Sequence, residues 1–429
     1  MKRGKVMKTL QRLGWIWLAL CFMAVPAGAG GLFIYELGNP GTGVASAGWA
    51  AAAQDASTVV TNPAGMTKLP QSQLLIGLQA NLPTVKFSAD AGTTTPGGSG
   101  GNAGVFLPAL TAFYVHKLNP KWSLGVSSVS FFGVALKYLD GWSGRYYMQE
   151  SNLITTATLF TAAYQVNEWL SVGGGVGPAF GAIRTRTAFN NPTPGFPDGT
   201  LRYKDTAWGV IGNFGILVEP RQGTRLGVSY ISPVAFDFKS GLDVDGPDPT
   251  LAAALGPAGL LDADLELNFS FPQMVMVSAY QQITPKFALL GNVGWQNWSA
   301  FGNIGVTISG INTTRATIDA KLRDTWHLAI GAQYRPRKDV MLSTGFAYDS
   351  SPVSDENRSI TLALDRQFRI SGGILVDLRP DFSLGFAYTY WNLGPNRLDE
   401  FKGPLAGRLE GHFTTNDVHI FNVSLIWKR

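Results

Sequence analysis

The sequence predicts an all-β protein, a transmembrane antiparallel β-barrel of about 14 strands that follows a short segment of different composition. Only 15% of the 429 residues are charged, and the chain contains 51 Gly and 12 Trp. Many segments of roughly ten residues alternate between apolar side chains and small or polar ones, which is typical of membrane β-strands. Strands with one apolar and one polar face require two solvents. A closed barrel in lipid provides both and leaves no unpaired strand edge.

Residues 1–29 are predicted to be a signal peptide. Basic residues precede a charge-free stretch from Leu13 to Ala29, which ends in the small residues "AGA" that suit signal peptidase. A retained membrane anchor is the alternative, but a spanning helix requires ~20 apolar residues. The signal contains five of the 34 basic residues and none of the 29 acidic ones, so the net charge of +5 does not indicate nucleic-acid binding. Cys21 is the only cysteine and lies in this signal, which leaves no thiol chemistry in the mature chain.

Residues 30–71 lack the two-residue period and are rich in Gly and Ala, which allow backbone to pack in a confined space. Asn62 followed by Pro63 favours the start of a helix, because Asn accepts backbone N–H bonds and Pro has a helical φ. A simple turn before the first strand is the alternative. The barrel is then predicted to occupy residues 72–429.

The alternation is clearest in "FSLGFAYTY", where bulky side chains at 382, 384, 386, 388 and 390 share one face. Residues 324–334 and 340–349 repeat the pattern. A soluble β-sandwich also alternates, but it would expose too many aromatic side chains here.

Short turns provide the strand count. They are predicted at 118–122, 166–169, 219–224, 283–287, 335–339 and 378–382. Six turns join twelve strands, and one further strand at each end makes 14. The predicted strand centres are residues 77, 112, 128, 159, 176, 211, 229, 275, 292, 328, 344, 372, 386 and 421. Longer polar segments at 84–107, 187–201, 238–263 and 393–413 are predicted to be extracellular loops, which places both ends of the barrel at the periplasm.

The segment "GLFIYELGNPGTGVASAGWAAAAQDASTVVTNPAGMTKL" before the barrel carries a family resemblance, as do "FFGVALKYLDGWSGRYYMQESNL" (131–153) and "NEWLSVGGGVG" (167–177). Together with the signal peptide and strand count, the chain resembles the FadL/TodX family of outer-membrane transporters for long-chain fatty acids and other hydrophobic compounds. The resemblance implies that residues 30–71 fold inside the barrel as a hatch that carries an Asn-Pro-Ala motif, here Asn62, Pro63 and Ala64. It implies a passive, non-enzymatic transporter of the bacterial outer membrane, without cofactor or metal.

The resemblance also implies a kink in the third strand, residues 121–138, that opens a gap in the wall for lateral release. By position the kink comprises Ser130, Phe131, Phe132 and Gly133. Family members often have Pro-Phe-Gly here, whereas this chain has Phe-Phe-Gly. Gly133 still permits a bend.

Two further sets of residues are candidate ligand contacts. The apolar run "LAAALGPAGLL" contains Leu251, Leu255, Leu260 and Leu261, which predict either a ligand-collecting groove or a helix that packs on a neighbouring loop. Arg184 and Arg186 are candidate contacts for a fatty-acid carboxylate, although lipopolysaccharide phosphates or solvent are the usual surroundings of such residues. The expected partners are therefore a hydrophobic small molecule, outer-membrane lipids and lipopolysaccharide, with a monomeric chain and no nucleic acid.

Two alternative functions remain open at this point, a pore for small polar solutes and an outer-membrane lipid hydrolase. A hydrolase requires a Ser–His pair with an orienting residue, for which the sequence gives no indication. The four histidines, His116, His327, His412 and His419, lack metal-ligand spacing, and alternation places His327 inside the barrel. The run "GGGVG" at 173–177 is not followed by the Lys-Ser/Thr of a phosphate loop, and we expect it to make room for the hatch. Fatty acids and aromatic hydrocarbons both fit as substrates.

Overall fold

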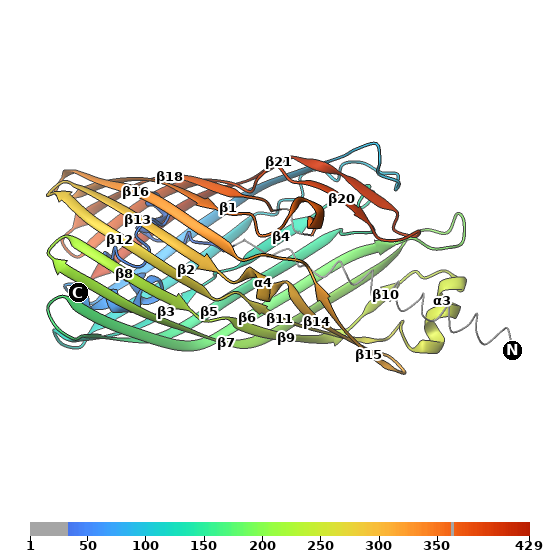
Figure 1. The fold of residues 1–429 in the computed structure, drawn as a ribbon, viewed down its shortest axis with the longest axis horizontal. Coiled ribbons are helices and arrows are strands. Elements are labelled where there is room, and N and C mark those ends of the chain that lie inside the picture. The colour runs from blue at the N-terminus through green and yellow to red at the C-terminus, as the bar shows by residue number, and fades with distance from the viewer. Residues whose placement is uncertain (1–32, 362–363) are drawn as a thin grey trace.

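The structure is a computed structural model that describes residues 33–361 and 364–429. The predicted signal peptide, residues 1–29 with Cys21, lies outside the described residues. A ring of 14 antiparallel strands forms the barrel wall (Figure 1). In ring order the strands are β1 (Gln73–Ala89), β2 (Leu107–Lys117), β3 (Trp122–Val129), β5 (Glu150–Gln165), β6 (Leu170–Phe189), β7 (Gly199–Arg221), β8 (Thr224–Ile231), β12 (Met274–Thr284), β13 (Phe287–Gln296), β16 (Thr325–Arg337), β17 (Val340–Asp349), β18 (Gln367–Arg379), β19 (Phe382–Asn392) and β21 (Arg408–Lys428). Hydrogen bonds between β1 and β21 close the ring.

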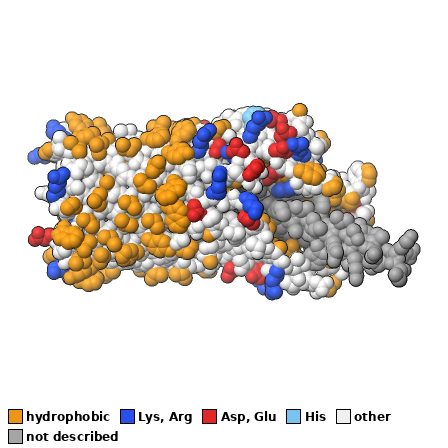
Figure 2. All heavy atoms as spheres, in the orientation of Figure 1, with side chains coloured by type: hydrophobic (Ala, Val, Ile, Leu, Met, Phe, Trp, Pro, Cys, Tyr) orange, Lys and Arg blue, Asp and Glu red, His pale blue; other side chains and the backbone are white. Residues whose placement is uncertain are grey.

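The fold class is confirmed, and each of the 14 predicted strand centres lies in a different ring strand. Because every ring pair is antiparallel, the six short turns share one end of the barrel with the C-terminus, and the long loops share the other (Figure 1). We call these the turn end and the loop end; in barrels of this kind the short turns face the periplasm. Figure 2 shows hydrophobic side chains over the turn-end half of this face, with most acidic and basic side chains beyond them. Such a band matches the apolar outer surface that a bilayer requires.

The wall continues toward the loop end as a second, four-stranded sheet. It contains β9 (Val234–Gly241), β11 (Asp264–Phe271), β14 (Asn303–Ser309) and β15 (Thr313–Asp319). The predicted loop at 238–263 is therefore too long, since its first residues belong to β9. Pro233 and Pro272 separate these strands from β8 and β12, because proline cannot donate a ladder hydrogen bond.

Short elements complete the loop end. They are β4 (Gly133–Lys137), β10 (Asp243–Asp245), α3 (Pro249–Leu255), η4 (Gly256–Ala258), α4 (Trp298–Phe301), η5 (Asp355–Asn357) and β20 (Arg397–Phe401). Within the residues that the structure describes, no helix is long and apolar enough to span a bilayer.

Residues 33–69, which we call the N-terminal segment, pack against the inside of the ring. The segment contains three short helices, η2 (Pro40–Val44), α2 (Thr58–Thr61) and η3 (Pro63–Lys68). Helix η2 contacts β16–β19, whereas η3 contacts β3, β5, β6 and β7 in a different part of the ring. The segment is almost entirely buried. Most of the segment lies inside the turn-end half of the barrel (Figure 1).

Glycines in the wall allow this close packing. A Cβ added to Gly173 would lie 2.7 Å from the backbone nitrogen of Ala64, and one added to Gly215 would lie 1.9 Å from Asn62 Oδ1. Real Cβ atoms do not approach other atoms so closely, so only glycine fits at these positions. Gly173 of the run "GGGVG" thus makes room for the segment as predicted. Similar approaches occur at Gly77, Gly125, Gly227, Gly331, Gly345 and Gly373.

Candidate functional site

The motif Asn62-Pro63-Ala64 joins two parts of the N-terminal segment to the barrel wall. Asn62 Oδ1 accepts a hydrogen bond from Ala64 N at 3.1 Å and so caps η3, which confirms the predicted helix start in 3₁₀ form. Its Nδ2 donates to Ala50 O at 2.6 Å and to Ile216 O of β7 at 3.0 Å. All the hydrogen-bonding capacity of this buried side chain therefore serves to hold the segment in place.

Other wall side chains satisfy the backbone of the N-terminal segment. Gly48 N donates to Asn292 Oδ1 at 2.7 Å, and Ala50 N donates to Ser278 Oγ at 2.9 Å. Asn213, Thr111 and Asn422 donate to segment carbonyls at Val59, Leu37 and Asn39. Irregular backbone inside a barrel needs such partners, because lipid and the apolar core offer none. The sequence did not predict these contacts, because alternation places a side chain on one face of a strand but does not say which part of the segment it meets.

The third strand is interrupted within the predicted stretch. Strand β3 ends at Val129 and β4 begins at Gly133, so Ser130, Phe131 and Phe132 belong to neither. The ladder between β2 and β3 also stops, at Ala112 and Ser128. Residues 107–111 of β2 pair with β1 but with no third-strand residue in the described chain.

Hydrogen bonds resume nearer the loop end, where Val105 N donates to Ala135 O at 3.3 Å and Lys137 N donates to Ala103 O at 2.8 Å. The unpaired stretch between these bonds and the Ala112–Ser128 pair we call the wall gap. It is bounded on both sides by paired backbone, so it is a local opening of the ladder and not an end of the sheet.

The N-terminal segment contacts the interrupted strand directly. Ile34 N donates to Phe131 O at 2.9 Å, and Phe33 and Phe132 form an isolated antiparallel bridge. On the other side, Thr155 N of β5 donates to Phe132 O at 3.1 Å. The carbonyls freed by the interruption are therefore satisfied by the segment and by β5.

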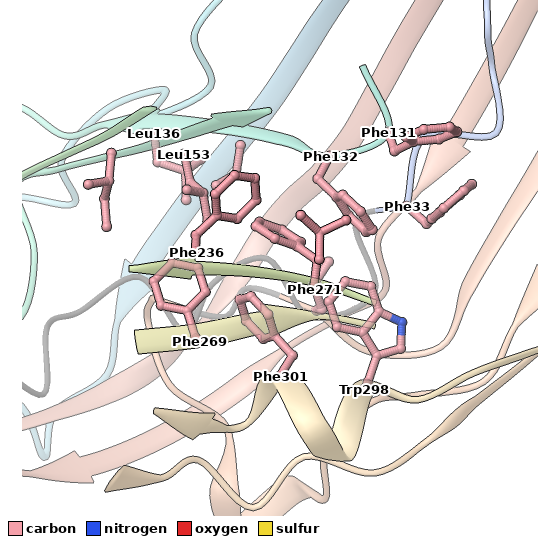
Figure 3. Packing of buried hydrophobic residues seen from close by; sticks show 14 of the residues in the cluster. Phe33, Phe131, Phe132, Leu136, Leu153, Phe236, Phe269, Phe271, Trp298 and Phe301 are labelled. Atoms are coloured by element: carbon pink, nitrogen blue, oxygen red, sulfur yellow. The ribbon is translucent and has the colours of Figure 1, made fainter. Parts of the chain in front are cut away.

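Aromatic side chains fill the barrel beside this contact (Figure 3). The ring centroid of Phe132 lies 4.4 Å from that of Phe271 and 5.9 Å from that of Trp298. Phe33, Phe131, Phe236, Phe238, Phe269 and Phe301 belong to the same buried cluster. The N-terminal segment, the third strand, the second sheet and α4 all contribute to it. Sequence reasoning missed this cluster, although the alternating Phe residues of "VAFDFK" and "LNFSF" were a signal for it.

An apolar cavity of about 70 Å³ lies beside the wall gap. Ile34, Leu107, Gly133, Leu136, Trp391 and Val418 line it, so it touches the segment, β2, β4 and the wall near β19 and β21. Asn81 and Asn416 are polar, and none of the described lining residues is charged. Benzene occupies an engineered cavity of ~150 Å³ in another protein, so this cavity is too small for such a ring until the segment or the third strand moves.

The family model described as "Outer membrane protein transport protein (OMPP1/FadL/TodX)" matches residues 20–425. The chain belongs to this family. The long-chain fatty acid transport protein of Escherichia coli O6:H1 is 25% identical over 94% of this chain and 96% of its own. Outer membrane protein P1 of Haemophilus influenzae is 25% identical over 87% and 88% of the two chains. The family assignment makes the chain an outer-membrane transport protein and sets the hydrolase alternative aside.

Solved structures share the fold. A Pseudomonas aeruginosa FadL homologue superposes with a TM-score of 0.83 and 21% identity over 92% of this chain and 99% of its own. The Ralstonia pickettii toluene transporter TbuX gives a TM-score of 0.68 and 18% identity over 92% of this chain and 100% of its own.

The four leucines predicted to form a groove, Leu251, Leu255, Leu260 and Leu261, lie in the loop that contains α3 and η4. Asp248 caps α3 through Leu251 N at 2.7 Å and also accepts from Thr193 N at 2.8 Å, which joins this loop to residues 190–198. Leu255 and Leu260 are buried, and Leu251 and Leu261 are partly buried against the same core. The helix-packing interpretation therefore accounts for Leu255 and Leu260, while the groove stays a prediction.

Arg184 and Arg186 lie on β6 toward the loop end. Arg184 Nε is 3.3 Å from Glu150 Oε1, and Arg186 pairs with Asp140. Their guanidinium groups are thus already engaged by carboxylates of this chain. His327 is buried inside the barrel, as predicted, with Nδ1 2.8 Å from Asp349 Oδ1. The described residues contain no cluster of His, Cys, Asp or Glu suited to a metal ion.

Proposed function

We propose that the chain takes up hydrophobic molecules passively across the outer membrane and releases them sideways into the bilayer. The relatives named as a long-chain fatty acid transport protein and a toluene transporter support fatty acids and aromatic hydrocarbons as the substrate classes. The loops around residues 190–198 and 246–263 serve as the outer collecting groove, and the cavity beside the wall gap serves as the internal pocket.

The observation that carries this proposal is the position of the apolar cavity. It touches Ile34 of the N-terminal segment on one side and Leu107 and Gly133 beside the wall gap on the other. A hydrophobic molecule in this place lies beside the wall gap, and none of the described residues that line the cavity is charged. A pore for polar solutes would instead require a continuous water-filled channel through the barrel. The buried aromatic cluster occupies the interior where such a channel would run.

In this mechanism the N-terminal segment acts as the hatch. Because Ile34 binds Phe131 and Phe33 pairs with Phe132, a shift of the segment moves the interrupted strand as well. The same shift enlarges the cavity and uncovers the wall gap. Substrate then leaves down its own hydrophobic gradient, since transfer from water to hydrocarbon is favourable.

A reversible disulfide between Phe33→Cys and Phe132→Cys tests this mechanism. The two residues face each other in a non-hydrogen-bonded antiparallel pair, a geometry with Cα atoms ~4.5 Å apart that suits a disulfide. Uptake of labelled oleate or toluene should be low in the oxidised double variant and restored by reductant. Each single Cys variant controls for the loss of the aromatic ring. Equal uptake in the oxidised and reduced states would refute movement at this contact, and ion conductance in planar bilayers would support the pore instead.

A further inference from the structure

A buried cluster of charged side chains joins the N-terminal segment to the loop-end half of the wall. Arg369 of β18 pairs with Asp349 of β17, and Asp349 Oδ1 is 2.8 Å from His327 Nδ1 of β16. Glu36 of the N-terminal segment lies against the same guanidinium, with Oε1 3.2 Å from Arg369 Nε. All four side chains are buried, so solvent does not screen the interaction of Arg369 with the two carboxylates. One guanidinium therefore faces two carboxylates.

The two carboxylates are held very differently. Asp349 accepts hydrogen bonds from both Arg369 and His327. Neither oxygen of Glu36 receives a hydrogen bond from the described part of the chain, although one lies within ion-pair distance of Arg369. A buried carboxylate without hydrogen bonds is costly, so Glu36 is the weakly held member of the cluster. His327 Nε2 also has no hydrogen-bond partner among the described residues.

The cluster lies directly behind the apolar cavity. Trp391 lines the cavity, and the guanidinium carbon of Arg369 is 4.2 Å from the centre of a Trp391 ring. On its other side Arg369 lies 5.2 Å from the ring of Tyr35, which stacks on His327. Ile34, two residues before Glu36, lines the same cavity. An apolar volume and an anion-binding group thus share one aromatic wall.

Resting on the proposed function, we propose that Arg369, with Asp349 and His327, forms a carboxylate subsite that Glu36 occupies in the closed chain. The carboxylate of an ionised fatty acid displaces Glu36 from Arg369 while its tail enters the cavity beside Trp391. Displacement of Glu36 from Arg369 releases the N-terminal segment at this point. Glu36 is only two residues from Ile34, which contacts the third strand. The site thereby selects amphiphiles with one carboxylate and couples their binding to release of the segment. A neutral hydrocarbon reaches the cavity without this exchange.

Glu36→Gln tests the exchange, because glutamine keeps the shape of the side chain and removes its charge. The measurement is equilibrium binding of laurate and of methyl laurate to the purified full chain in one detergent, reported as the ratio of their affinities. Both probes have the same tail, so the ratio isolates the head group. We expect the ratio in favour of laurate to rise about tenfold in Glu36→Gln, since one charge-assisted contact no longer competes for Arg369. A second variant, Glu36→Gln with Arg369→Met, should return the ratio to the wild-type value or below.

Glu219→Gln is the matched control. Glu219 also anchors the N-terminal segment, through Lys68 Nζ at 2.8 Å, but at the turn end and away from the cavity. Its loss loosens the segment without freeing Arg369, so the ratio should stay within about twofold of wild type. An equal rise in both variants would show general loosening and overturn the subsite, as would an unchanged or lower ratio in Glu36→Gln with methyl laurate still bound. Failure of the wild-type chain to bind either probe would overturn the proposed function itself.

Discussion

Ile34 donates its backbone N–H to the carbonyl oxygen of Phe131 at 2.9 Å, across the interruption of the third strand. Ile34 belongs to the N-terminal segment, and Phe131 belongs to the wall. At the interruption, the third strand lacks ladder hydrogen bonds to the neighbouring strand β2. It makes a hydrogen bond to the N-terminal segment instead. In the proposed mechanism, this contact and the Phe33–Phe132 bridge link the wall gap to the position of the segment.

Asn62→Ala should reduce uptake while the barrel still assembles. The substitution removes three hydrogen bonds and leaves the carbonyls of Ala50 and Ile216 without this donor, at a cost of about 1–3 kcal/mol to docking of the segment. The ring keeps all its ladder hydrogen bonds, so heat-modifiable migration of the folded barrel should persist. Uptake of labelled oleate is then measured at equal surface level. Normal uptake under those conditions would contradict a role for the motif.

Gly173→Ala and Gly174→Ala form a matched pair in β6. The new Cβ at Gly173 meets Ala64 N at 2.7 Å, whereas the one at Gly174 meets Asn213 O at an ordinary 3.4 Å. We expect Gly173→Ala to displace η3, at a cost of about 1–3 kcal/mol, and Gly174→Ala to have little effect. Protease sensitivity of residues 33–69 in the purified protein measures the displacement. Equal sensitivity of the two variants would show that the segment does not depend on this glycine.

Glu400→Gln should change the pH dependence of the loop end. Burial raises the pKa of Glu400 above its ordinary value of 4.5, and Lys402 opposes this only in part. Because the folded chain holds this proton more tightly than the unfolded chain, the stabilisation is complete below pH 4.5 and is lost as the pH rises through the raised pKa. Glutamine stays neutral throughout. Proteolysis of the outer loops should therefore be slower in the variant at pH 7 and equal to wild type below pH 4.5.

Glu356→Gln is the control for this comparison, because Glu356 is exposed in η5 at the same end of the barrel. It should match wild type at both pH values. Faster cleavage of Glu400→Gln at pH 7 would indicate that the charged form of Glu400 stabilises the loops, which is the opposite sign.

Residue order alone predicted the family and the 14 strands, and it showed which side chains share a face in residues 324–334, 340–349 and 382–390. These properties depend on a two-residue period and on turn length, both of which are local, and the boundary between lipid and interior makes the period strict. The interruption at Ser130 to Phe132 was predicted by family position. Gly133, which follows it, has no side chain to resist a bend.

Only the tertiary structure decided which side chains meet inside the ring. The buried cluster combines Glu36 with three residues that lie about 300 residues further along the chain, His327, Asp349 and Arg369. No spacing along the chain indicates that they meet. The same holds for Gly173 and Ala64, because their contact depends on how deeply the N-terminal segment sits in the barrel. Alternation assigns a residue to the inside of a closed wall, but the wall curves, and the residue opposite is set by strand register around the whole ring. The sequence pattern is therefore enough to predict the family and the barrel. The buried cluster around Arg369 forms only when the ring of strands closes and brings its members together.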